Sequence, residues 1–338
     1  MPEVIEVRKF ADILSENIIG KTITHINILK GRYKKKIFDG YNDLIKALPL
    51  KIEAIHTKGK FTYMTFVSVN NNDNDNDNND NNNKKFYLFN TLGLSGGWTL
   101  KSDKKNNFAK CKNCNYFERE KDIFTYPSIL DYISKNNQTK WFETELKHLN
   151  VEFITDYKNI SFYFYDQLSF GTLKAVDCNI NGETILEKKL KELGPDLLDD
   201  TTTFELFKIQ LRKKVNENKA IGNVIVNQKI ISGVGNYLRA DSLWMSKLSP
   251  FRKVKDTTDD ELKTLYDSII GLIWGDYNYE FAIKKKYIKS SLKLPHHYNR
   301  DFFIYNHIKD IYNNTIRKEE LYEGSQKRFI YWVKSIQV

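Results

Sequence analysis

The segment from Asn227 to Trp244 constrains this chain more than any other, because it reads as two helices joined by a tight turn. The turn contains Gly233 and Gly235, and glycine adopts backbone conformations that other residues avoid. Asn236 follows at the start of the second helix. Because backbone N–H groups at a helix N-terminus attract anions, we expect this turn and the Asn236 side chain to bind an anionic oxygen such as that of a phosphate.

The composition favours a globular protein that binds a polyanion. The chain has 338 residues, 41% of them hydrophobic, which suffices for a buried core and suits two domains better than one. The net charge of +10 and the pI near 9.1 point to nucleic acid, although charge alone leaves a protein without a charged partner about equally open. An acidic protein partner is disfavoured.

Targeting and cysteine usage indicate an intracellular protein. The sequence has no run of about 18 apolar residues and no signal peptide, so we expect no membrane association and no secretion. The three cysteines, Cys111, Cys114 and Cys178, are an odd number in a large chain. They favour a reducing compartment over a disulfide framework.

The first half of the chain is expected to form a sheet domain that opens with a helix. Apolar residues at helical spacing predict a helix over 3–19, and Gly20 would end it. Alternating β-branched and aromatic residues predict strands between residues 22 and 68, and again at 86–89 and 160–165.

Two segments interrupt this sheet pattern. The Asn/Asp tract within residues 69–84 has nothing to bury and is expected to be a disordered loop between strands. Residues 101–158 are predicted to be a long charged insertion.

The second half is expected to be mostly helical. Leu193-Gly194-Pro195 breaks the strand pattern, and helices are predicted at about 203–217, 219–228, 236–247 and 258–273. The tail from Phe302 to Gln337 is strand-like, with Asn313-Asn314 as the candidate hairpin turn.

The stretch Gly233-Val-Gly-Asn-Tyr-Leu-Arg239, together with Pro2, Glu3 and Glu6 near the N-terminus, resembles the formamidopyrimidine-DNA glycosylase/endonuclease VIII family, nearest to its endonuclease VIII form. The resemblance implies an α+β fold of two domains. A β-sandwich with an N-terminal helix would occupy 1–192, a helix–two-turn–helix domain 193–300, and a β-hairpin in the form of a zincless finger 301–338.

The resemblance makes Pro2 the candidate nucleophile and Glu3 a candidate acid. Removal of Met1 would leave Pro2 with a secondary amine, which forms a cationic iminium with a sugar carbon and so an electron sink. Glu3 would protonate the sugar ring oxygen, a role that calls for an apolar wall, or would only stabilise a helix dipole. Glu6 would support the active site. Met-Pro-Glu is by itself a common beginning without catalytic meaning.

Three further positions match the DNA-binding motifs of that family. Lys60, after Gly59, resembles its catalytic lysine near the phosphates, although it could equally be an exposed lysine at a strand end. Leu94 occupies the position of the side chain that wedges into the base stack, and Phe170 that of a side chain filling the void. Leu168 replaces the usual Arg, which leaves recognition of the opposite base open.

Residues 327–337 resemble the second half of the family's four-cysteine zinc finger, but Val333 and Ile336 stand where cysteines would be. We therefore expect no metal there and no cofactor. Arg328 keeps the position of an arginine that grips a phosphate. Cys111 and Cys114 form half a zinc site at most, and a metal there is the less favoured alternative.

The combined interpretation is a bifunctional DNA glycosylase/AP lyase of base excision repair that acts as a monomer. Its partner would be double- or single-stranded DNA with oxidised bases or abasic sites, and it would be found wherever that DNA is. The rival hypothesis is a non-catalytic nucleic-acid-binding protein with the same helix–two-turn–helix. The sequence does not select the lesion.

Overall fold

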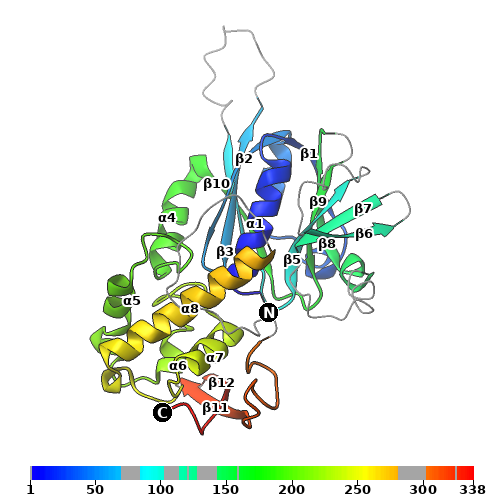
Figure 1. Cartoon of the computed structure of the whole chain (residues 1–338). Coiled ribbons are helices and arrows are strands. Elements are labelled where there is room, and N and C mark those ends of the chain that lie inside the picture. Colours follow the sequence, from blue (N-terminus) through cyan, green and yellow to red (C-terminus); the bar gives the residue numbers. More distant parts are fainter. Residues whose placement is uncertain are drawn as a thin grey trace. The chain divides into compact units, whose positions relative to one another are not determined.

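The computed structural model divides the chain into two compact units, one of Met1–Pro2 and Glu6–Leu190 and the other of Glu3–Ile5 and Lys191–Val338 (Figure 1). The described residues are 2–69, 84–102, 114–119, 122–127, 143–157, 160–280, 302–323 and 326–338. The Asn/Asp tract, Cys111 and half of the expected insertion lie outside them. In the described part, no helix is long and apolar enough to cross a membrane.

The first unit is an antiparallel sheet domain. Its sheet has ten strands in the order β10-β4-β3-β2-β1-β8-β9-β5-β7-β6. The strands are β1 (Thr22–Ile28), β2 (Leu50–Lys58), β3 (Phe61–Ser68), β4 (Lys85–Thr91), β5 (Gly96–Ser102), β6 (Cys114–Arg119), β7 (Asp122–Pro127), β8 (Leu149–Thr155), β9 (Ser161–Asp166) and β10 (Thr172–Asp177).

Short helical elements surround these strands. They are η1 (Gly31–Lys34), α2 (Tyr41–Lys46), η3 (Cys178–Ile180) and α4 (Gly182–Glu192). The N-terminal helix α1 (Val4–Ile18) agrees with the predicted span, and Gly20 follows with a φ of +82° that suits glycine. Val7, Phe10 and Leu14 of α1 are buried, as their helical spacing predicts.

The expected insertion over 101–158 is partly wrong, because its last residues form a central strand. β8 pairs with β1 on one side and with β9 on the other. Phe153 of β8 is fully buried and stacks on Phe162 of β9 with ring centroids 4.6 Å apart. The charged residues around β8 obscure its short apolar pattern in the sequence. Tertiary packing decides whether such a short segment forms a strand.

The second unit is helical and ends in a two-stranded hairpin. Its elements are α5 (Phe204–Leu211), η4 (Lys214–Asn216), α6 (Ile221–Val224), α7 (Asn236–Met245), η5 (Val254–Asp256), α8 (Asp259–Glu280), β11 (Arg317–Glu323) and β12 (Gln326–Trp332). Figure 1 shows the hairpin beside α6 and α7. The predicted α+β class is confirmed, with a sheet domain, a helical domain and a terminal hairpin.

Two helices are shorter than predicted. The expected helix over 203–217 is α5 followed by the single turn η4, and the one over 219–228 is only α6. The helix ends at Val224, and after it the Asn227 side-chain oxygen accepts the Lys229 N–H at 3.0 Å, which favours a turn over a longer helix.

The predicted hairpin turn at Asn313-Asn314 is misplaced. Asn313 lies with a φ of +67° in a smaller turn closed by a bridge between Lys309 and Thr315. The paired strands of the hairpin come later, where Arg317 pairs with Trp332 at one end and Glu323 with Gln326 at the other.

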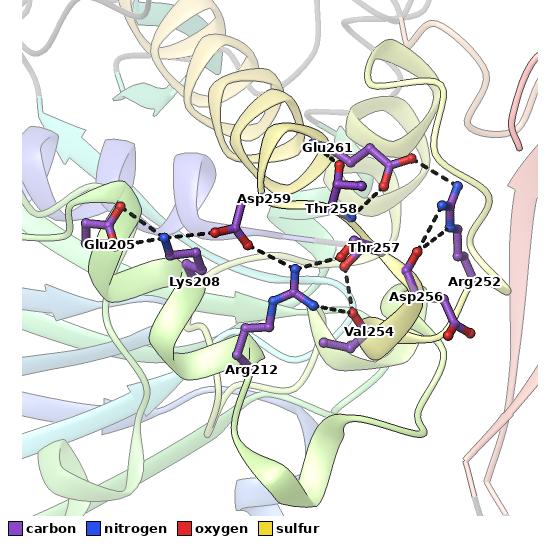
Figure 2. A network of polar contacts seen from close by, with 10 residues as sticks. All are labelled: Glu205, Lys208, Arg212, Arg252, Val254, Asp256, Thr257, Thr258, Asp259 and Glu261. Atoms are coloured by element: carbon purple, nitrogen blue, oxygen red, sulfur yellow. Dashed lines mark hydrogen bonds and ion pairs between the residues drawn. The ribbon is translucent and has the colours of Figure 1, made fainter.

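A polar network fixes the start of α8 (Figure 2). Thr258 and Glu261 form a capping box, since the Thr258 N–H donates to Glu261 Oε2 at 2.7 Å and the Glu261 N–H donates to Thr258 Oγ1 at 3.2 Å. Arg212 donates to the carbonyl oxygens of Val254 at 3.0 Å and Thr257 at 2.6 Å. The capping box at the start of α8 and the bonds of Arg212 to the residues before it therefore fix where the helix begins.

The capping box gives a stability prediction. Thr258→Ala removes one side of it and should lower the free energy of unfolding by about 1 kcal/mol. Thr264→Ala is the matched control, because the Thr264 hydroxyl lies inside the same helix and donates only to the Asp260 carbonyl at 2.9 Å. Urea unfolding of both variants checks this, and equal losses would show that the cap has no special weight.

Candidate nucleic-acid interface and active site

Glu3 is joined to the N-terminus of α7 by backbone hydrogen bonds. Its carboxylate accepts the N–H of Gly235 at 2.6 Å and that of Tyr237 at 2.9 Å, with a longer bond from Leu238 at 3.4 Å. Glu3 is fully buried. These donors satisfy N–H groups that a helix start leaves unpaired, and the helix dipole favours a negative charge there.

This environment differs from the expectation of an apolar wall beside Glu3. The carboxylate faces N–H groups of the turn, and it caps α7 instead of the helix that follows it in the sequence. The Val4 N–H adds a bond to the Gly233 carbonyl at 3.1 Å. The residues directly after Pro2 are thus fixed to the turn.

The two glycines of the turn serve different purposes. Gly233 has a φ of +108°, and a Cβ there would come within 2.8 Å of the Val4 Cβ, so a larger residue would be strained and would collide. The expectation that Gly235 needs a special backbone conformation is wrong. Its φ of −127° is open to other residues, and its N–H donates to Glu3.

Arg239 connects the helix that carries Asn236 to the strand that carries Arg328. The Arg239 side chain donates to Asn236 Oδ1 at 3.3 Å and to the carbonyl of Phe329 at 2.6 Å, and Phe329 follows Arg328 in β12. Arg328 is exposed and makes no ion pair with any described residue. Because Asn236 Oδ1 faces Arg239, its amide nitrogen, which has no partner in the described part of the chain, is left to donate to an anion.

Arg239 is the functional residue that the sequence analysis missed. Its side chain is fully buried, and a third bond runs to the Gly222 carbonyl at 3.4 Å. Burial, and secondarily the positive charge of Arg328, lower the pKa of Arg239 to about 10. Its position one helical turn after Asn236 was the available signal, because residues three apart on a helix are neighbours.

Hydrogen bonds of buried side chains hold the tail together. Asp310 accepts bonds from the Tyr312 and Asn314 N–H groups at 3.0 and 2.8 Å and from the Trp244 indole at 3.0 Å. Gln337 accepts the N–H of Val333 at 2.6 Å and donates to the Leu248 carbonyl at 3.0 Å. Val333 itself is buried.

Asp241 also anchors the tail. It accepts three backbone N–H bonds, of which those from Phe303 and Ile304 measure 3.1 and 3.0 Å. Burial raises the pKa of Asp241 to about 7 even though these bonds act in the opposite direction. Among the residues that the structure describes, no three His, Cys, Asp or Glu side chains are grouped to hold a metal.

The other candidate catalytic residues belong to the first unit. Pro2 is buried and immediately precedes Glu3 in the chain. Glu6 is buried in the first turn of α1. Lys60 is half-buried in the turn between β2 and β3, where Gly59 has a φ of +55°.

Leu94 and Phe170 extend from two loops that are bonded to each other. Their side chains are 45% and 59% exposed, which is unusual for large apolar residues. The Ser95 hydroxyl donates to Asp166 Oδ1 at 2.6 Å and accepts the Leu168 N–H at 2.8 Å. The structure therefore assembles the two candidate wedge residues on one support.

Asp166 is the centre of that support. It is buried, and its second oxygen accepts the Gly171 N–H at 2.6 Å. A Cβ on Gly93 would come within 2.5 Å of the Phe170 carbonyl carbon, so the loops are in direct contact. A motion of one loop must therefore affect the other.

Glu145, in the helical turn before β8, lies near this support. It is buried, and its Oε2 has no hydrogen-bond partner among the described residues. Burial, with the negative charge of Asp166 as the smaller cause, raises the pKa of Glu145 to about 8. The carboxyl group is thus protonated at neutral pH.

Glu145 predicts a pH dependence of stability. Because its pKa in the folded protein lies above the unfolded value of about 4.3, the folded state binds the proton more tightly, and stability falls as pH rises from about 4.5 to about 8. Glu145→Gln removes this loss, so its stability relative to the wild type should rise by on the order of 2 kcal/mol between pH 5 and pH 8. Thermal unfolding across pH measures this.

Glu143→Gln is the matched control, because Glu143 is exposed in the same helical turn. Its difference from the wild type should stay constant with pH. A constant difference for Glu145→Gln as well would contradict the raised pKa.

Arg239 predicts a second stability effect. Arg239→Lys keeps the charge but replaces the planar guanidinium, with its several N–H donors, by a single ammonium group. Carbonyl oxygens are then left unpaired, which should lower the free energy of unfolding by about 2 kcal/mol. Arg317→Lys in β11, an exposed position, should change it by less than about 0.5 kcal/mol. Chemical denaturation compares the two, and equal effects would show that the buried fork contributes little.

Comparisons with known proteins agree with this geometry. Residues 1–173 match the family model of the formamidopyrimidine-DNA glycosylase N-terminal domain, and residues 193–275 match that of its H2TH domain. The chain is 34% identical over 156 residues to a formamidopyrimidine-DNA glycosylase of Ligilactobacillus salivarius, over 44% of this chain and 53% of that protein. It is 34% identical over 83 residues to an endonuclease 8 of Salmonella arizonae, over 25% and 32%. These alignments therefore span about half of those relatives or less.

Solved structures show the same fold. A Lactococcus lactis FPG variant in complex with DNA containing Fapy-dG superposes with a TM-score of 0.66 at 18% identity, over 99% of both chains. A complex of Lactococcus lactis Fpg with DNA containing an abasic site gives a TM-score of 0.64, also at 18% identity and over 99% of both chains. The two domain matches, in order along the chain, identify this protein as a member of the formamidopyrimidine-DNA glycosylase family.

Proposed function

We propose that this chain is a bifunctional DNA glycosylase and AP lyase that removes oxidised bases. The observation that carries the proposal is the bonding of Glu3, the residue next to Pro2, to the turn that presents Asn236. Glu3 follows the candidate nucleophile in the sequence and is hydrogen-bonded to the turn of the candidate phosphate site. Family membership and the DNA in the related structures support it.

Pro2 is the proposed nucleophile, once Met1 has been removed. The neutral amine attacks C1′ of the damaged nucleotide, the bond from C1′ to the base breaks, and the base leaves with the electron pair and takes up a proton. The nitrogen then loses its proton, the bond from C1′ to the ring oxygen breaks, and that oxygen takes up the proton by way of Glu3. The result is an iminium between the Pro2 nitrogen and C1′.

The iminium permits strand cleavage. Loss of a C2′ proton moves electrons toward the cationic nitrogen, and the 3′-phosphate leaves with the C3′–O electron pair. Loss of a C4′ proton next expels the 5′-phosphate in the same way. Water finally hydrolyses the imine and restores the Pro2 amine.

Glu3, Glu6 and Lys60 assist in this proposal. Glu3, a carboxylate stabilised by the N–H groups of Gly235 and Tyr237, takes up the proton that the Pro2 nitrogen loses on forming the iminium and gives that proton to the ring oxygen. Glu6 supports the site from the first turn of α1, and Lys60 contacts the phosphates beside the lesion and assists elimination.

Asn236 and Arg328 are proposed to hold the DNA backbone, with the N–H groups around Gly233 and Gly235 contributing the positive end of α7. The amide nitrogen of Asn236 and the exposed guanidinium of Arg328 both donate to phosphate oxygens. Arg239 bonds both the Asn236 side chain and the carbonyl of Phe329, the residue after Arg328, and so connects the two elements that carry the proposed contacts.

Leu94 and Phe170 are proposed to fill the gap left by the extruded nucleotide. Filling it offsets part of the unstacking cost, which is a few kcal/mol. Leu168, 53% exposed, adds an apolar side chain where an arginine would read the orphaned base. We therefore propose tolerance of several opposite bases, or action on single strands, by a monomer located with the DNA.

Borohydride trapping tests the nucleophile. The wild-type protein should become covalently linked to DNA carrying an abasic site, because borohydride reduces the iminium to a stable amine. An N-terminal tag that blocks Pro2 should abolish the linkage, and removal of the tag should restore it. Lys60→Ala should retain trapping while slowing cleavage.

The outcomes separate the two hypotheses for the chain. Trapping that persists with the tag in place would assign the nucleophile to a lysine and refute the role of Pro2. Tight binding to abasic DNA without any trapping would favour the non-catalytic nucleic-acid-binding protein.

A further inference from the structure

A basic segment that the proposed mechanism does not use runs from Lys30 to Lys36, with the sequence Lys-Gly-Arg-Tyr-Lys-Lys-Lys. It holds five cationic residues and no acidic one. Its four lysines are exposed. Their ammonium groups make no hydrogen bond or ion pair with any residue that the structure describes.

The segment is fixed to the sheet and does not extend freely. It contains η1, and Gly31 has a φ of +71° with no room for a Cβ, which would come within 2.5 Å of the Asn150 amide. The N–H groups of Leu29 and Lys30 donate to the Asn150 carbonyl at 2.8 and 3.3 Å. The Asn150 side chain in turn donates to the Asp166 carbonyl at 3.4 Å.

The same segment holds the loop that carries Phe170. Arg32 donates to the Ser169 carbonyl at 3.3 Å, and the Tyr33 hydroxyl accepts the Leu173 N–H at 2.7 Å. These bonds fix the loop on both sides of Phe170. The lysines that follow Tyr33 therefore lie next to a loop with an exposed aromatic side chain.

We propose that residues 30–36 are a phosphate-binding surface for the DNA that flanks the point where Phe170 inserts. The inference rests on the proposed function, because that function places Phe170 in DNA. Adjacent cations without acidic partners repel one another, and a polyanion such as a nucleic-acid backbone neutralises them while releasing counterions.

Arg32 adds to this surface at the loop itself. A guanidinium has five N–H donors, and the bonds to the Ser169 carbonyl and the Tyr33 hydroxyl use two of them. The guanidinium also lies over the Tyr33 ring, 4.9 Å from its centroid, and its remaining N–H groups make no hydrogen bond with a described residue. Arg32 can thus supply, beside the Phe170 loop, a positive charge that Leu168 lacks.

The test measures binding of a short duplex with a tetrahydrofuran abasic-site analogue by fluorescence anisotropy over a range of KCl concentrations. Lys34→Gln, Lys35→Gln and Lys36→Gln are combined in one variant, which leaves Arg32 and Tyr33 in place. The slope of log K against log[salt] should become shallower by about two to three units, because each neutralised phosphate contributes about 0.9. Affinity at moderate salt should fall about tenfold or more.

The control combines Lys46→Gln, Lys51→Gln and Lys188→Gln, which are exposed lysines elsewhere in the same unit. It lowers the net charge equally and should change the slope by less than about one unit. Equal slopes for the two variants would refute the proposal, since the net charge of the protein and not the position of the lysines would then decide binding.

Further outcomes separate this proposal from the proposed function. If the wild type traps abasic DNA with borohydride but the Lys34–Lys36 variant keeps the full salt slope, only the basic surface is refuted. If the wild type neither binds nor traps, the proposed function fails. If polyglutamate competes as well as duplex DNA, the surface is a general anion site, and the assignment to DNA is overturned.

Discussion

The capping of α7 by the buried Glu3 carboxylate is the contact on which the proposed chemistry depends. The N–H groups of Gly235 and Tyr237 would otherwise be unpaired at a helix start, and the carboxylate would otherwise be buried without compensation. Each group therefore requires the other. Pro2, the proposed nucleophile, directly precedes this bonded residue in the chain.

Buried polar groups perform a second structural task in the helical unit. Arg239 connects α7 to β12, Asp241 anchors the segment after residue 302, and Asp310 and Gln337 close the turns of the tail. Each of these side chains satisfies backbone groups that would be costly to bury alone. These hydrogen bonds help to hold the tail that contains the hairpin, which carries the exposed Arg328 proposed to contact a phosphate.

Much of the fold and part of the candidate site could be predicted from sequence. The helical period of α1, the turn at Gly233 and the two-domain order follow from local patterns, which are strongest in long periodic segments. β8 was missed because the charged residues around it obscure its short apolar pattern and because one of its two partners, β1, lies far away in the sequence. The helices are shorter than predicted because side chains such as Asn227 compete locally. Arg239 and Asp166 act through contacts with residues 90 and 71 positions away, which no local pattern contains.

Amide hydrogen exchange at Gly235 and Tyr237 tests the role of Glu3 most directly. If its carboxylate caps α7, both amides should exchange only through rare opening, and Glu3→Gln should raise their exchange rates by at least about tenfold, since a hydrogen bond to a charged group contributes about 1.5–3 kcal/mol. The amide of Met64, in the middle of β3, should be unaffected. Exchange of Gly235 and Tyr237 at the rate of exposed amides in the wild type, or no change in the variant, would contradict this account of how the N-terminus is held.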